Sequence, residues 1–131
     1  MKEKPVVYLA SPYRGAVAQN EAFARLALAY AIQSGVVPVA PHLLYPQVLK
    51  EQKAKEREIG IEMGLSLLRR CDELWLCGNE VSSGMELELQ EALKAGILVR
   101  RIPAEEIYRV FLPDEIQQRE MGGQDVLEQS I

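Results

Sequence analysis

Short apolar segments recur along the chain and have the length of β-strands. They span residues 6–10, 36–40, 74–77 and 97–99. The first reads Val-Val-Tyr-Leu-Ala, without the alternation of a half-exposed strand, which predicts a strand covered on both faces. Pro38 lacks the N–H group that a sheet ladder needs, so the second segment is predicted to be an edge or irregular strand.

The stretches between these segments carry helical signals. Asn20 suits the N-cap of a helix that stops at Ser34-Gly35, and Gly96 suits the end of another. The predicted helices cover about residues 20–33, 58–70, 86–95 and 105–111. Because strands and helices alternate, the strands are expected to pair in parallel through right-handed crossovers. The predicted fold class is α/β, a small Rossmann-like (flavodoxin-like) three-layer sandwich with a mostly parallel sheet of four to five strands.

The composition is that of a single globular domain. The chain has 131 residues, of which 48% are hydrophobic and 26% are charged. Residues 113–131 are polar, with Gly122-Gly123 and little apolar content. We therefore predict one α/β domain over residues 1–112, followed by a polar tail that is disordered or serves as an oligomer arm.

Charge and cysteine content narrow the possible partners. A formal net charge of -4 provides no general basic surface, so neither nucleic acid nor an anionic membrane is expected to bind. The N-terminus is short and polar, and no apolar run approaches the roughly 18 residues of a membrane span. Cys71 and Cys77 are six apart, which fits neither a zinc ribbon nor a redox pair. These observations predict a cytoplasmic protein whose cysteines are core residues.

Ligands of an open parallel sheet bind beyond the carboxyl ends of its strands. The first loop there offers a hydroxyl, an aromatic ring, a guanidinium and a glycine, a set suited to a phosphate or a sugar. These residues are Ser11, Tyr13, Arg14 and Gly15. The loop matches neither a Walker A nor a dinucleotide-binding motif. The alternative interpretation is a turn with a solvated arginine.

A second loop leads through Ser82, Ser83 and Gly84 into the third predicted helix. Glutamates early in that helix complement its dipole, and Ser83 with Glu86 has capping-box spacing. Helical periodicity places Glu86 and Glu88 at similar angles on opposite sides of the apolar stripe and does not decide between them. His42, between Pro41 and Leu43, either lines the pocket or fills a proline-rich corner.

Taken together, these strings resemble the nucleoside 2-deoxyribosyltransferase-like superfamily, and more closely a branch of small bacterial and phage domains within it. The resemblance covers roughly residues 5 to 102. It is carried, in this order, by Tyr8-Leu9-Ala10-Ser11-Pro12-Tyr13-Arg14-Gly15, Pro41-His42, Cys71-Asp72-Glu73-Leu74-Trp75 and Ser82-Ser83-Gly84-Met85 with Glu88.

The resemblance implies a glutamate nucleophile that attacks the anomeric carbon of a deoxyribosyl group and forms a glycosyl-enzyme ester. In the family, alanine follows this glutamate by four residues and glycine by eight. Ala92 and Gly96 meet both conditions for Glu88, which we therefore prefer to Glu86. The resemblance also implies that Tyr8, on the first strand, lies near the nucleophile.

The resemblance extends to ligand contacts. Arg14-Gly15 matches the pair with which nucleotide-hydrolysing relatives hold a 5'-phosphate, and Ser82 stands where those hydrolases have serine and the transferases aspartate. Both matches favour a phosphorylated ligand. Where relatives place a sugar-contacting aspartate, this chain has Gly64, and our hypothesis is that Glu62 reaches the same space.

The sequence thus predicts an N-glycosyl-bond cleaving enzyme, either a nucleoside deoxyribosyltransferase or a nucleoside 5'-monophosphate N-glycosidase. Glu88 and Tyr8 are the expected catalytic residues, and no metal or organic cofactor is required. A homo-oligomer, a dimer or higher, is expected because relatives complete the pocket across a subunit interface. One alternative is a non-catalytic nucleotide-binding or sensor domain. A structural domain whose tail mediates assembly is the other.

Overall fold

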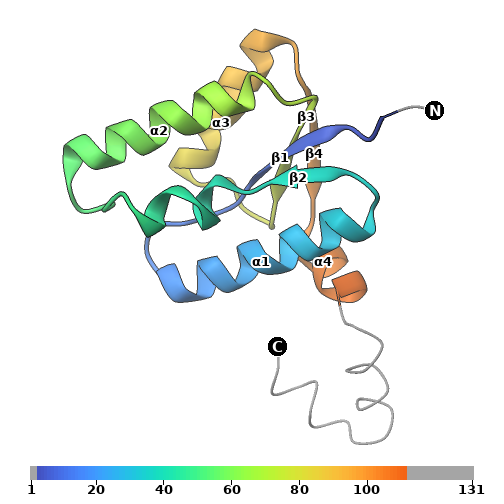
Figure 1. Ribbon diagram of the computed structural model, residues 1–131. Helices are drawn as coiled ribbons and strands as arrows, with labels where there is room; N and C mark the ends of the chain where they lie inside the picture. Colours follow the sequence, from blue (N-terminus) through green and yellow to red (C-terminus); the bar gives the residue numbers. More distant parts are fainter. Residues whose placement is uncertain (1–2, 112–131) are drawn as a thin grey trace, which may run out of the picture.

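The computed structural model describes residues 3–111, and the predicted tail over residues 113–131 lies outside them. Within this range a parallel sheet forms the centre of the fold, in the order β2-β1-β3-β4 (Figure 1). Its strands are β1 (Val6–Ala10), β2 (Val37–Val39), β3 (Glu73–Cys77) and β4 (Leu98–Ile102). This arrangement confirms the predicted α/β class, and β2, with its Pro38, lies at an edge as predicted.

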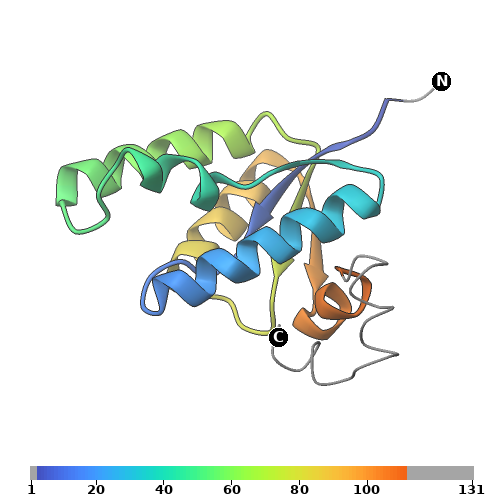
Figure 2. The same cartoon turned by 60° about the horizontal axis from the view of Figure 1, so that its bottom comes forward.

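Helices cover both faces of the sheet. They are α1 (Val17–Gln33), α2 (Ala54–Leu68), α3 (Ser83–Ala95) and α4 (Ala104–Phe111), and the short 3-10 turns η1 (Pro41–Leu43) and η2 (Tyr45–Gln47) precede α2. One face carries α1 and α4, and the other carries α2 and α3 (Figures 1 and 2). The three predicted layers are therefore present.

Strand β1 explains why this core has two halves. Val7 and Leu9 are buried in the cluster on the α1 and α4 face, whereas Tyr8 and Ala10 are buried on the α2 and α3 face. Side chains of a strand alternate between faces, so a continuous apolar run fills both halves. The same alternation directs the hydroxyl of Tyr8 toward α2 and α3.

Several element boundaries differ from the prediction by a few residues, among them the starts of α1 and α2. Helix α1 begins at Val17, so Asn20 is not its N-cap. Instead, the Asn20 amide donates hydrogen bonds to the carbonyl oxygens of Tyr13 and Arg14, which ties the preceding loop to the helix. Helix α2 begins at Ala54, within the charged stretch that was expected to precede it.

Helix α3 ends with the cap Gly96 as predicted, and the left-handed backbone of this glycine can be tested by substitution. Gly96 caps the helix with φ of 71°, whereas Gly84 lies in the first turn without positive φ and with open space at its Cβ position. We expect Gly96→Ala to lower the free energy of unfolding by about 1 kcal/mol. Gly84→Ala should leave it unchanged or raise it slightly. Urea denaturation followed by circular dichroism measures both, and equal effects would contradict this account.

Candidate active site

A cavity of about 430 Å³ lies beyond the carboxyl end of β1 on the α2 and α3 face. Its walls come from β1, the loop after it, residues 41–51, α2 and the first turns of α3. Strand β2 lies on one side of β1 and β3 lies on the other, so the order in which strands are added reverses at β1. Such switch points are where open α/β sheets bind ligands. The fold therefore brings the predicted loops together around one space.

Glu88 lies in this cavity and is almost completely buried, with 7% of its surface exposed. Helix α3 buries Met85, Glu88 and Ala92 on one face, so the carboxylate points inward while Glu86 is exposed. The Tyr8 hydroxyl donates a hydrogen bond to Glu88 Oε2. Glu88 Oε1 has no hydrogen-bond partner among the described residues. The pocket thus contains a carboxylate with one oxygen held and the other free.

Burial controls the protonation of this pair. Desolvation raises the pKa of Glu88 to about 7, and the hydrogen bond from Tyr8 opposes this rise because it stabilises the carboxylate. Desolvation, together with the nearby Glu88 charge, raises the pKa of Tyr8 well above its usual value. Tyr8 therefore remains a protonated donor, and Glu88 changes its charge near neutral pH.

Gly64 on α2 makes room for this contact. A Cβ atom at residue 64 would lie 3.0 Å from Tyr8 Oη, closer than side-chain contacts normally come. The absence of a side chain at Gly64 therefore accommodates the tyrosine hydroxyl. Glu62 is exposed and is not among the residues that line the cavity, so the structure does not bring it to the site.

The N-terminal end of α3 forms a polar side of the cavity. Ser82, Ser83 and Gly84 line it, and Ser82 is the N-cap, its Oγ accepting a hydrogen bond from Met85 N. The predicted capping box of Ser83 with Glu86 is therefore wrong by one residue. With Ser82 as cap, the reciprocal position falls on Met85, which has no carboxylate.

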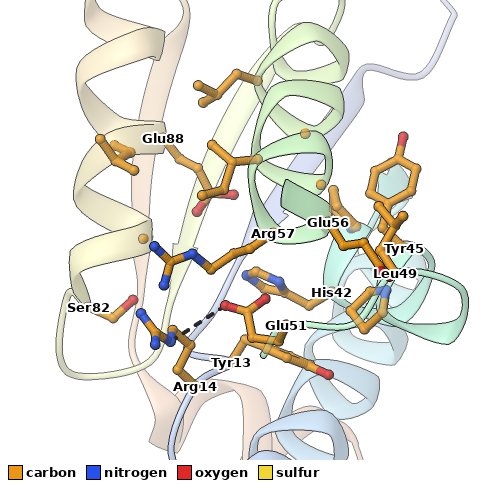
Figure 3. Close-up of a pocket in the computed structure, with 18 of the residues that line it drawn as sticks. Tyr13, Arg14, His42, Tyr45, Leu49, Glu51, Glu56, Arg57, Ser82 and Glu88 are labelled. Carbon is orange, nitrogen blue, oxygen red and sulfur yellow. Dashed lines mark ion pairs between the residues drawn. The ribbon is translucent and has the colours of Figure 1, made fainter. Parts of the chain in front are cut away.

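Two guanidinium groups face this polar side among the described residues. Arg14, predicted from the first loop, and Arg57, near the N-terminus of α2, both point toward the end of α3 where Ser82 lies (Figure 3). Arg57 Nε is buried without a hydrogen-bond partner in the described part of the chain. Arg57 was not among the site residues predicted from the sequence. A usable signal was its place near a helix N-terminus, where the dipole disfavours a cation.

Aromatic side chains occupy another part of the cavity wall. The rings of Tyr13 and His42 stack with centroids 5.3 Å apart and an interplanar angle of 21°. Burial lowers the pKa of His42, so the imidazole is neutral near pH 7. Both residues line the cavity, as Tyr45 does. Of the two interpretations of His42, the structure therefore agrees with the one in which it lines the pocket.

Other sequence candidates lie outside the cavity lining. Ser11 is buried at the start of the loop, and Gly15 turns the chain with φ of 94°. Cys71 and Cys77 are free and buried, and desolvation raises their pKa values to about 11 and about 12, which fits core residues. No cluster of metal-ligating side chains occurs among the described residues. Nor does this part of the chain contain a helix long and apolar enough to cross a membrane.

The raised pKa of Glu88 predicts a pH dependence of stability. The unperturbed value is 4.5, so the free energy of unfolding should fall as the pH rises from about 4.5 through about 7, by roughly 2 to 3 kcal/mol. Glu88→Gln stays neutral and should remove this contribution. Urea denaturation of both proteins at pH 5 and pH 8 gives the difference, in which all other titrating groups cancel. The same pH dependence in both would contradict the assignment.

Comparison with known proteins places the fold and the family. The comparison with curated proteins gave no match. Among solved structures, the chain is similar to the 2-deoxyribosyltransferase from Bacillus psychrosaccharolyticus, with a TM-score of 0.61 and 17% identity, over 75% of this chain and 72% of that chain. The resemblance found in the sequence is thus confirmed for the fold. A family model described as "Domain of unknown function (DUF7768)" matches residues 5–102, and the chain therefore belongs to that family.

Proposed function

We propose that this protein cleaves the N-glycosyl bond of a nucleoside or a nucleoside 5'-monophosphate, with Glu88 as the nucleophile. The observation that carries the proposal is the pairing of Glu88 with Tyr8 inside the cavity. A buried carboxylate that is hydrogen-bonded through one oxygen and unpartnered at the other is costly unless a ligand uses it. The fold shared with a 2-deoxyribosyltransferase supports the same chemistry.

The proposed reaction proceeds through a covalent ester. Glu88 Oε1 attacks the anomeric carbon, the bond from that carbon to the base nitrogen breaks, and the base leaves with the electron pair and takes up a proton from solvent. Water or a second base then attacks the same carbon and releases the carboxylate. Two displacements on opposite faces retain the configuration of the sugar, as in retaining glycosidases.

Tyr8 is proposed to position the nucleophile. Its hydrogen bond fixes Oε2, which leaves Oε1 directed at the sugar, and it stabilises the ionised form that attacks. Arg14, Ser82, Ser83 and Gly84 are proposed to hold the phosphate or the sugar hydroxyls. The stacked Tyr13 and His42, with Tyr45, offer flat apolar faces for the base. The predicted homo-oligomer stays a prediction, which size-exclusion chromatography tests.

A second candidate is a nucleotide-binding domain that no longer turns its ligand over. Gly64 favours it, because relatives place a sugar-contacting aspartate there and the exposed Glu62 does not line the cavity. Tight binding of a nucleotide without release of base, unaffected by Glu88→Gln, would support this candidate over the enzyme.

The catalytic assignment is tested by a matched pair of variants on one helix. The protein is incubated with 2'-deoxynucleosides and their 5'-monophosphates, and free base is followed by chromatography. We expect Glu88→Gln to reduce base release by a factor of about 1,000 or more, because an amide does not form the ester. Glu86→Gln, at the exposed alternative, should retain activity. Base release that survives Glu88→Gln would refute the nucleophile.

The role of Tyr8 is tested by the pH dependence of kcat/KM. Only ionised Glu88 attacks, so the rate should rise with pH through about 7. In Tyr8→Phe the hydrogen bond that lowers the Glu88 pKa is lost, and the rising limb should move to higher pH. Tyr45→Phe, another tyrosine of the cavity wall, should leave the limb in place. An unmoved limb in Tyr8→Phe would contradict the positioning role.

A further inference from the structure

The two arginines of the cavity wall differ in their partners: Arg14 forms an ion pair, whereas Arg57 Nε has no partner among the described residues. This Nε atom is buried, and an unpaired buried donor costs stability. Arg57 is also placed against the dipole of α2, at the end where a helix favours anions. Both features are unfavourable, and both would be relieved by a negatively charged ligand group between α2 and α3.

Glu51 already places a negative charge in this region. It lies between η2 and α2, lines the cavity, and its Oε1 is 3.5 Å from Arg14 Nε. Figure 3 shows its side chain reaching across the cavity toward Arg14, on the side where Arg57 and Ser82 also lie. Its side chain is 34% exposed, although it belongs to a highly charged surface segment. A carboxylate of the chain thus interacts with the cation that a ligand anion would use.

We propose that Arg57 is a specificity-determining residue that holds the 5'-phosphate of the ligand together with Arg14, and that Glu51 is an intramolecular competitor which this phosphate displaces. This inference rests on the proposed function for the nucleoside part of the ligand. It narrows the substrate class from nucleosides in general to nucleoside 5'-monophosphates.

The chemistry of the wall favours a phosphate over a neutral sugar group or a single carboxylate. A phosphate monoester carries about -1.5 to -2 charges at pH 7 and three acceptor oxygens. Arg14 and Arg57 supply two positive charges and planar donor sets suited to phosphate. Ser83 and Gly84, at the first turn of α3, add backbone N–H groups and the positive end of the helix dipole.

The test measures binding rather than turnover. Glu88→Gln serves as the background because it does not react, and isothermal titration calorimetry gives Kd for 2'-deoxynucleosides and for their 5'-monophosphates. We expect the monophosphates to bind on the order of 100-fold more tightly, since two charge-assisted contacts each contribute about 10-fold or more. Arg57→Met should remove roughly 10-fold or more of this preference, and Arg57→Lys should remove less. Arg25→Met, an exposed arginine on α1, is the matched control.

Glu51→Gln is expected to strengthen monophosphate binding, a result that a misfolded variant would not give. It frees Arg14, so monophosphates should bind several-fold more tightly, while nucleoside affinity stays the same. Equal affinities for nucleosides and monophosphates, or weaker monophosphate binding in Glu51→Gln, would overturn the inference. In the protein with Glu88 intact, base release from unphosphorylated nucleosides and from monophosphates at equal efficiency would overturn it too, while leaving Glu88 as nucleophile. Binding of monophosphates that depends on Arg57, without any base release by the protein with Glu88 intact, would support the inference and refute the catalytic proposal.

Discussion

The hydrogen bond from Tyr8 to Glu88 joins residues 80 positions apart, at the centre of the sheet and on the helix that packs against it. Both side chains are buried, and a buried carboxylate is stable only when it is hydrogen-bonded or neutral. Several other features are needed to make this contact. Ser82 caps the start of α3, and Gly64 leaves the space that the tyrosine hydroxyl occupies.

The buried residues of α3 have two different roles. Met85 and Ala92, one turn on either side of Glu88, contribute the apolar burial that holds the helix on the sheet. The stability that these neighbours provide allows the helix to carry an acid in its buried face. The raised pKa of Glu88 reflects the free energy that burial costs its ionised form. Stability and the proposed chemistry therefore oppose each other at one residue.

Much of the fold was predictable from the sequence, because it depends on long apolar patterns. Strand β1 has the predicted bounds since it is buried on both faces and therefore has no polar gap. The site was less predictable. Helical periodicity treats every glutamate as a surface residue and cannot identify Glu88 as buried. Only the family spacing to Ala92 and Gly96 favoured Glu88 over Glu86. Arg57 belongs to a charged stretch that looks solvated in sequence, and its position in the cavity follows from where α2 starts.

Gly64 links the family resemblance to the particular geometry of this chain. A side chain at residue 64 would place its Cβ atom 3.0 Å from the Tyr8 hydroxyl, a tight contact that the hydroxyl relieves only by moving a few tenths of an ångström. An acid at this position would therefore displace the hydroxyl that donates to Glu88. Under the proposed function, this chain binds its ligand without an acid at residue 64, and the ligand affinity must come from other contacts. The cationic wall of Arg14 and Arg57 is then the place where binding energy is expected to concentrate.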